Sequence, residues 1–365
     1  HFYRLLQRAK NISILYNTET DDFGSGERSR FLSQLIAEYH HNPIKQFIFG
    51  GDLLDFKQEA DICIPNNGLS SEISRWSKWV SPSALNMYIN CSLSFYYKYL
   101  ARIRQQDDVE EFAESNIIGS SIHEALDDVY PLGPLTSSKI QTVAERLISS
   151  VEVKFGEHMK GSDIYQGKNY LALQVAKKLA SNFLNFEKEA VDISIKDGIT
   201  TNILESEGVF QHDLDIDGHI FTIKGKVDRV DEFGDKIRVI DYKSGRVDKI
   251  DVSFREWNDL IKNQSKSKAF QLLIYTYLYL KSNPHYLDRR VIAGNFSFKN
   301  LEEGLITVSH YVNNKKETLC IDKDILEEIE LLIGNIVKKI MSEDFVQTDD
   351  KKRCEYCDYK SICNR

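Results

Sequence analysis

The run from Gly225 to Gly245, GKVDRVDEFGDKIRVIDYKSG, constrains the fold of this 365-residue chain most. Two apolar-rich stretches flank Glu232–Asp235, whose glycine and acidic residues are typical of a hairpin turn. Asp228 and Asp241 are equally far from the middle of that turn, so we predict that they face each other across two antiparallel strands, about 5 Å apart. Strand alternation puts Asp241 and Lys243 on one face and Tyr242 on the other.

Two facing carboxylates repel each other, which raises the pKa of one of them unless a cation lies between them. Mg²⁺ or Mn²⁺ binds one or two carboxylates together with water and phosphate oxygens, and it lowers the pKa of bound water. Lys243 would stabilise negative charge at the same face. The pattern therefore predicts phosphodiester hydrolysis. The alternative is a surface hairpin in which aspartate and lysine only form an ion pair.

The periodicity of apolar residues predicts further elements around this hairpin. A strand over 208–216 precedes it and joins the next strand through Asp217-Gly218. The remaining predicted elements are helices over 83–91, 93–103, 117–129, 138–155, 170–190, 268–281 and 325–341, and strands over 219–231, 236–242, 291–299 and 305–311.

The first part of the chain is expected to be a separate small α/β piece, residues 1–58, with helices over 2–10 and 28–39 and strands over 12–16 and 46–49. Residues 59–81 turn polar and include Pro65 and Gly68, which is typical of a linker. The remaining domain is then 82–365. Because the chain starts at His1 inside a predicted helix, we expect it to be a piece of a longer protein.

The chain carries 47 Lys and Arg against 55 Asp and Glu, a net charge of −8. This balance argues against binding nucleic acid through bulk charge, but it leaves room for a local basic groove. No run of about 18 apolar residues is present, so we predict a soluble, cytoplasmic protein with no membrane partner.

Three of the six cysteines, Cys354, Cys357 and Cys363, crowd into the last twelve residues with the spacing C-x2-C-x5-C. Such spacing is typical of a metal site, and Cys91 is the candidate for a fourth ligand. By chemistry alone, four thiolates bind Zn²⁺ or an iron–sulfur cluster. Cys63 and Cys320 have no partner at ligand spacing and are expected to be ordinary thiols.

G-K-V-D-R followed by V-I-D-Y-K-S-G resembles the motifs of the PD-(D/E)XK nuclease superfamily, specifically the RecB and AddB type. The resemblance implies an α/β fold, with a mixed (α+β) sheet flanked by helices, and a metal-dependent DNA nuclease. Gln271 and Tyr275 resemble the family's Q-x-x-x-Y helix, which would hold the site or the strand being cut. His123 in GSSIHEAL resembles its G-x-x-x-H element, so His123 and the Tyr242 carbonyl would complete the metal site of Asp228 and Asp241.

The same resemblance implies that Cys91, Cys354, Cys357 and Cys363 hold a [4Fe–4S] cluster, with Zn²⁺ as the alternative. The segment FYRLLQRAKNISILYN is similar to the last motif of superfamily 1 helicases, with Arg8 in the place of its arginine, and residues 26–35 also look AddB-like. An amphipathic helix with an incidental arginine is the alternative. No G-x-x-x-x-G-K-[ST] occurs, so we expect no ATP site in this sequence.

The resemblance thus implies an exonuclease, part of a helicase-nuclease of double-strand-break repair, that acts on single-stranded DNA ends. Its partners would be the helicase portion of a parent chain and a second subunit. Residues 243–268 hold seven Lys and Arg against four Asp and Glu and would contact DNA. The alternatives are a non-catalytic DNA-binding scaffold and an RNA or nucleotide phosphohydrolase.

Overall fold

The computed structural model describes residues 2–15, 28–38, 44–45, 47, 62–103 and 112–363. The chain divides into two compact units, residues 1–59 and 60–365. In the first, α1 (Phe2–Leu6) and α2 (Arg30–Glu38) pack through stacked Phe2 and Phe31 rings, 5.8 Å apart. Residues 12–15 form no strand, so that prediction is wrong over its described part. The strand over 46–49 lies largely outside the described residues.

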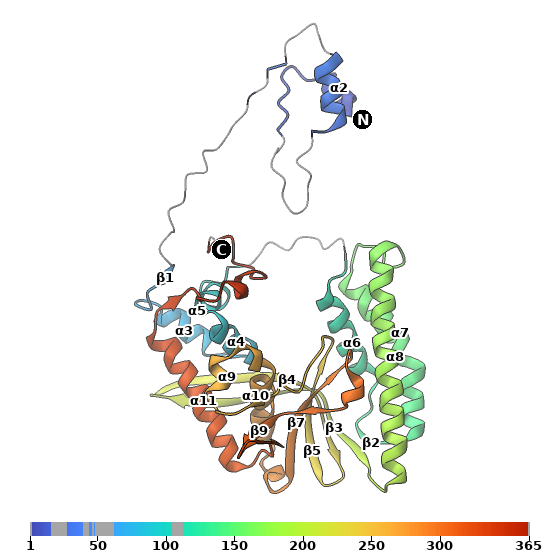
Figure 1. The fold of residues 1–365 in the computed structure, drawn as a ribbon, viewed down its shortest axis with the longest axis vertical. Coiled ribbons are helices and arrows are strands. Elements are labelled where there is room, and N and C mark those ends of the chain that lie inside the picture. Colours follow the sequence, from blue (N-terminus) through green and yellow to red (C-terminus); the bar gives the residue numbers. More distant parts are fainter. Residues whose placement is uncertain are drawn as a thin grey trace. The chain divides into compact units, whose positions relative to one another are not determined.

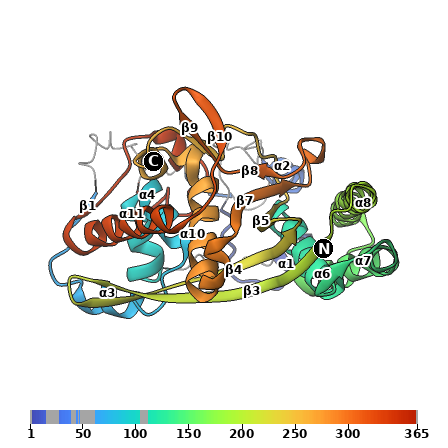
Figure 2. The same ribbon diagram turned by 90° about the horizontal axis from the view of Figure 1, so that it is seen from below.

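The second unit is built on a six-stranded sheet in the order β2-β3-β4-β5-β7-β8 (Figures 1 and 2). Its strands are β2 (Gly133–Leu135), β3 (Thr201–Ile216), β4 (His219–Phe233), β5 (Lys236–Lys243), β7 (Arg290–Ser297) and β8 (Ile306–Thr307). Among the described strands of this sheet, only β5 and β7 pair in parallel. A parallel pair needs a crossover, which here contains a helix, α10 (Ser267–Ser282). The predicted mixed sheet flanked by helices is confirmed.

Helices cover both faces of this sheet, and each face has its own apolar core. One core contains α6 (Ser115–Val129), α7 (Ser137–His158) and α8 (Gly167–Lys196), and the other contains α4 (Pro82–Asn90), α10 (Ser267–Ser282) and α11 (Lys323–Ser342). Along β5, Ile240 and Tyr242 enter the first core whereas Ile237 and Val239 enter the second. Figure 1 shows α7 and α8 on one side and α4 and α11 on the other.

The predicted linker differs from the structure, because residues 62–81 fold as part of the second unit. Strand β1 (Cys63–Ile64) pairs with β11 (Phe345–Val346), and α3 (Ser70–Trp76) follows it. The reason is apolar burial at helical spacing. Ile73 and Trp76 of α3 are buried, and Trp76 contacts Phe95 edge to face at 5.0 Å. The predicted domain boundaries themselves remain a prediction.

Short elements complete the second unit. The predicted helix over 93–103 is α5 (Ser92–Phe95) followed by a π-helical turn, Tyr96–Leu100. The predicted strand over 305–311 is divided between β8 and β9 (Ser309–Val312), and β9 pairs with β10 (Lys315–Thr318) and β6 (Ser253–Phe254). Helix α9 (Asp259–Lys262) is a single turn. None of the helices in the described part of the chain is long and apolar enough to cross a membrane.

Candidate active site

The β4–β5 hairpin brings the two predicted aspartates together. Arg229 pairs with Ile240, so the register puts Asp228 opposite Asp241, as the distance from the turn predicted. Asp228 Oδ2 accepts a hydrogen bond of 2.6 Å from the backbone N–H of Tyr242. The hairpin therefore fixes both carboxylates at the end of β5, where the strand leaves the sheet. The role of the Tyr242 carbonyl as a metal ligand stays a prediction.

Asp241 is buried and contacts Lys243 of its own strand and Asn295 of the neighbouring strand β7. Lys243 Nζ lies 2.8 Å from Asp241 Oδ2, which agrees with the expected side-chain alternation. Asn295 of β7 is paired with Asp241 in the parallel register, and its Nδ2 donates to Asp241 Oδ2 at 2.6 Å. Burial raises the pKa of Asp241 to about 6; Lys243 opposes this rise and the charge of Asp228 adds to it. The site thus concentrates negative charge that a bound cation would stabilise.

Asn295 did not stand out in the sequence, because one asparagine inside an apolar strand carries no motif. Its side chain is fully buried, and Oδ1 has no hydrogen-bond partner among the described residues. Nδ2 also donates to the backbone oxygen of Asp241 at 3.2 Å. Both contacts of the amide orient Asp241.

His123 joins the site from helix α6. Its Nδ1 lies 3.3 Å from Asp228 Oδ2, and its ring contacts the Tyr242 ring edge to face. Burial lowers the pKa of His123, but the hydrogen bond and charge of Asp228 outweigh it and leave the pKa raised. Gly119, one turn earlier, allows this approach because a Cβ there would lie 2.8 Å from Ser244 Oγ.

Glu207 is a site residue that the sequence analysis missed. One ligand atom from each of His123, Glu207 and Asp228 lies within 4.8 Å of the others. Glu207 has a left-handed backbone, with φ of 51°, and forms an ion pair with Lys226. Burial raises its pKa. A signal was present, since Glu207 and Asp228 are equally far from the Asp217-Gly218 turn and face each other in the β3–β4 hairpin.

Gln271 and Tyr275 of α10 extend the site through hydrogen bonds. Lys243 Nζ donates to Gln271 Oε1 at 2.9 Å, and Gln271 Nε2 donates to the Tyr275 hydroxyl at 2.8 Å. Gly225 lets α10 lie close to β4, because a Cβ there would approach the Tyr275 ring to 3.1 Å. The ammonium of Lys243 is therefore held between Asp241 and Gln271.

Part of the candidate site lines an open cavity of about 380 Å³ between α6 and the β3–β5 strands. Its walls include Gly119, His123, Glu207, Lys226, Asp228 and Lys243. With Glu124, which also lines it, the cavity carries four acidic or metal-binding groups beside two ammonium groups. This combination suits a divalent cation together with an anionic substrate.

A buried charge network lies directly behind the site. Arg229, next to Asp228 on β4, forms ion pairs with Glu187 of α8 and with Asp231, and Arg238 pairs with Asp231 at 2.6 Å. Arg229 is only 2% exposed. The network ties α8 to the strand that carries Asp228.

The four predicted cluster cysteines come from two distant parts of the chain. Cys91 lies between α4 and α5, and the C-terminal segment with the other three lies beside α5 (Figure 1). Burial raises the pKa of Cys363, and the neighbouring thiols Cys91, Cys357 and Cys354 add to this effect. None of the six cysteines forms a disulfide. Among the described residues, no three cysteine sulfurs lie within 4.8 Å of one another.

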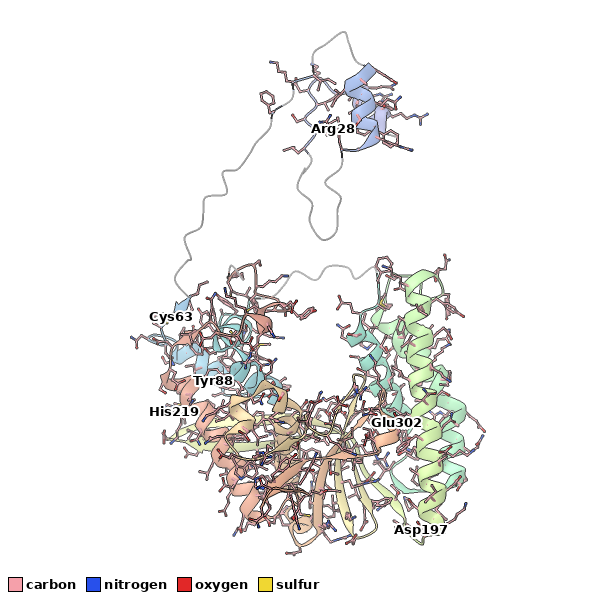
Figure 3. The ribbon with its side chains drawn as sticks, viewed as in Figure 1. Arg28, Cys63, Tyr88, Asp197, His219 and Glu302 are labelled. Atoms are coloured by element: carbon pink, nitrogen blue, oxygen red, sulfur yellow. The ribbon has the colours of Figure 1, made fainter. Side chains whose placement is uncertain are left out.

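Neighbouring side chains attach the C-terminal segment to the rest of the unit. Arg353 donates to the backbone oxygen of Asn90 at 3.0 Å, and Ser94 Oγ lies 3.4 Å from Cys357 Sγ. Tyr88, labelled in Figure 3, packs edge to face on Phe345. Cys63 is exposed on β1, and Cys320 accepts from Arg290 at 3.4 Å, so neither belongs to this group.

Arg8, the predicted helicase-like arginine, is exposed after α1 in the first unit. Residues 26–27 of the second helicase-like segment lie outside the described residues. The relation of this unit to helicases therefore stays a prediction.

Comparison with known proteins identifies a family. A family model described as "PD-(D/E)XK nuclease superfamily" matches residues 79–364. The chain is 24% identical over 245 residues to one subunit of an ATP-dependent helicase/deoxyribonuclease of Carboxydothermus hydrogenoformans. That alignment covers 61% of this chain but only 20% of the relative. The solved structure of SSO0001 covers 68% of this chain and 94% of its own at 14% identity, with a TM-score of 0.25, which is too low to say anything about function.

Proposed function

Because this chain belongs to the PD-(D/E)XK nuclease superfamily, we propose that it is a Mg²⁺- or Mn²⁺-dependent deoxyribonuclease. The observation that best supports this proposal is that His123, Glu207 and Asp228 converge on one point. Asp241 and Lys243 form an ion pair beside them. These donors come from α6, β3, β4 and β5 and include three carboxylates. Such a set suits a hard divalent ion.

The donor set fits the ion chemically, because three carboxylates gather in a partly buried place where burial raises the pKa of Glu207 and of Asp241. We propose His123, Glu207, Asp228, Asp241 and the Tyr242 carbonyl as its ligands. A bound ion would polarise the phosphate and lower the pKa of a coordinated water.

The chain's own groups would orient the substrate. Lys243, held between Asp241 and Gln271, is the group that would contact the phosphate and stabilise the charge that develops there. Tyr275 would position Lys243 through Gln271.

The test is cleavage of end-labelled, single-stranded DNA with Mn²⁺ by the wild type, Asp241→Ala and Lys243→Ala. Asp235→Ala is the matched control, because Asp235 is exposed at the turn of the same hairpin. We expect cleavage by the wild type and the control only. Equal signals from all four proteins would leave the non-catalytic scaffold as the better explanation. Cleavage of RNA or nucleotides in preference to DNA would support a phosphohydrolase of another substrate class.

We propose exonuclease action on single-stranded ends. Linear and circular single-stranded DNA of the same sequence separate the two modes of cleavage. An exonuclease degrades the linear form and leaves the circle intact, whereas loss of the circle would indicate endonuclease action.

We further propose that Cys91, Cys354, Cys357 and Cys363 hold a [4Fe–4S] cluster. Four partly buried thiols without disulfides fit such a group, and it would join α4 and α5 to the C-terminal segment. This resembles closing a very long loop, so the role is structural. Zinc–sulfur bonds of about 2.3 Å in a tetrahedron would hold the sulfurs about 3.8 Å apart. A [4Fe–4S] cluster allows its four cysteine sulfurs to lie farther apart than a single zinc ion does.

Anaerobically purified protein should then be brown and contain about four irons per chain. A colourless protein with one zinc would contradict the cluster.

We propose that this chain is the nuclease part of a cytoplasmic helicase-nuclease in recombinational repair. The support is the helicase/deoxyribonuclease relative, of which the chain spans about one fifth. DNA, the helicase portion and a second subunit would be the partners. This sequence contains no G-x-x-x-x-G-K-[ST], so we expect no ATPase activity from it alone. ATP turnover that Asp241→Ala leaves unchanged would contradict this.

A further inference from the structure

Three lysines from distant parts of the second unit meet at the loop that follows β5. Lys266 Nζ donates to the backbone oxygen of Ile250 at 2.6 Å, and Lys316 Nζ donates to that of Lys249 at 2.8 Å. Lys249, Lys266 and Lys316 are called the lysine cluster below. Two backbone carbonyls of the loop thus hold the ammonium groups of Lys266 and Lys316.

The local fold builds this cluster through a tight hairpin. Asn313 and Asn314, with φ of 50° and 62°, form the two-residue turn between β9 and β10, and asparagine suits these left-handed positions. Strand β9 pairs with β6, which directly follows the loop. The hairpin projects from the rest of the unit in Figure 2. Its Lys316 reaches the loop through the hydrogen bond to the Lys249 backbone oxygen.

The positive charge of the cluster is incompletely neutralised. Glu303 pairs with Lys249, and Asp251 pairs with Lys268. Among the residues that the structure describes, no carboxylate lies within 4.0 Å of the Lys266 or Lys316 nitrogen. Burial lowers the pKa of Lys316, and the ammonium groups of Lys249 and Lys266 lower it further. Like charges held together in this way favour a polyanionic ligand.

An exposed stacking group, Arg255, lies against the same hairpin. The Arg255 guanidinium lies 4.5 Å from the centre of the Tyr311 ring and donates to Asn314 Oδ1 at 3.1 Å. Arg255 is exposed, so its outer face is free to stack on an unpaired base. Duplex DNA keeps its bases stacked inside the helix and cannot use this surface.

The cluster begins close to the candidate active site. Lys249 follows Lys243 by six residues, which span at most about 21 Å even when fully extended. Phe298 N donates to the Lys243 backbone oxygen at 2.9 Å and Asn300 Nδ2 to that of Val247 at 3.2 Å, so the loop is anchored to the end of β7. At about 3.4 Å per nucleotide of a stacked strand, this upper limit corresponds to about six nucleotides, and an extended single strand covers it with fewer.

We propose that Lys249, Lys266 and Lys316 bind the phosphate backbone of single-stranded DNA within about six nucleotides of the cut bond, with Arg255 stacking on a base. This rests on the proposed function for its substrate. It goes further by naming the path of the strand, which includes a hairpin distant in sequence from the nuclease motifs.

The first test measures binding without cleavage. Fluorescence anisotropy of a labelled 20-nucleotide DNA in EDTA, over a series of KCl concentrations, gives the salt dependence of affinity for the wild type and for Lys249→Gln/Lys266→Gln/Lys316→Gln. Loss of three phosphate contacts should reduce the slope of log affinity against log salt by about 2. The corresponding triple change to Arg should keep the wild-type slope. An unchanged slope in the Gln variant would overturn the proposal.

The control variant is Lys323→Gln/Lys338→Gln/Lys339→Gln, because these are exposed lysines on α11 and give the same change in net charge. Its slope should equal that of the wild type. An equal loss in the control would show a bulk charge effect and overturn the proposal. Blunt duplex should bind more weakly than the single strand, and Arg255→Ala should reduce that preference. Equal binding of both DNA forms by the wild type would overturn the assignment to single strands.

The second test measures cleavage of 4- and 20-nucleotide single strands with Mn²⁺. The Gln variant should lose more of its rate on the long strand than on the short one, so that most of the advantage of the long strand disappears. If wild-type protein cuts neither strand, the proposed nuclease function fails. The binding test still shows whether the lysine cluster binds single-stranded DNA. If wild-type protein cuts both and the Gln variant keeps the full length preference, only the surface fails.

Discussion

The side-chain amide of Asn295 donates a 2.6 Å hydrogen bond to Oδ2 of Asp241, its partner in the parallel β5–β7 register. A donor at this place favours the ionised form of the carboxylate. Burial raises the pKa of Asp241 to about 6. The hydrogen bond also directs that carboxylate toward Lys243, so Asn295 is a positioning residue.

Asn295→Ala should therefore raise the pKa of Asp241, because a lost donor disfavours the charged form. The acid limb of the activity profile with Mn²⁺ should move to higher pH, while the rate at high pH recovers in part. Profiles for the wild type and Asn295→Ala, with Asn295→Ser as the conservative variant that keeps a donor, measure this. A uniformly lower rate with no shift of the acid limb would contradict the positioning role.

Metal affinity should fall as the pH falls below about 6. The pKa of Asp241 is raised to about 6 by burial, and His123 has a raised pKa through Asp228, so both groups take up protons in this range and protons compete with the ion. Mn²⁺ titrations followed by electron paramagnetic resonance between pH 5 and 8 check this. Affinity that does not change with pH would place the ion elsewhere.

Glu187→Ala should destabilise the second unit by about 3–5 kcal/mol, because it leaves Arg229 buried with one of its partners removed. Urea unfolding gives the free energy. Glu189→Ala, an exposed position on the same helix, is the control and should change it by less than about 0.5 kcal/mol. Similar values for both variants would mean that the network does not hold α8 to β4.

Gly119→Ala should reduce cleavage, since its Cβ would lie 2.8 Å from Ser244 Oγ and 3.3 Å from Ser244 Cβ and would push α6, with His123, away from β5. Adding Ser244→Gly removes both contacts and should restore much of the activity. Rates of the single and double variants on the same DNA test this. Failure of the second change to rescue the first would assign Gly119 a role other than close approach.

The sequence was most informative where spacing fixes geometry. The β4–β5 turn sets the register of Asp228 and Asp241, and a helical spacing of four puts Gln271 beside Tyr275. Glu207 and Asp228 are likewise equally far from the preceding turn, but Glu207 belongs to no motif that would have drawn attention to it. Asn295 could not be predicted, because its contact with Asp241 depends on a parallel pairing between strands 54 residues apart.

The described part of the predicted linker, residues 62–81, was misjudged for a different reason. Its polar residues and Pro65 are typical of a loop, but Ile73 and Trp76 bury enough apolar surface to hold α3 against the core. The helix over 93–103 was predicted as regular, whereas the structure has a π-helical turn at Tyr96–Leu100 that no local pattern indicated.

Anomalous diffraction from crystals soaked in Mn²⁺ tests the central claim most directly. We predict a manganese peak within bonding distance of His123, Glu207 and Asp228, on the side of Asp241. Crystals of Asp228→Asn should show no such peak. A manganese peak at other residues, with the space between these side chains empty in the wild type, would contradict it.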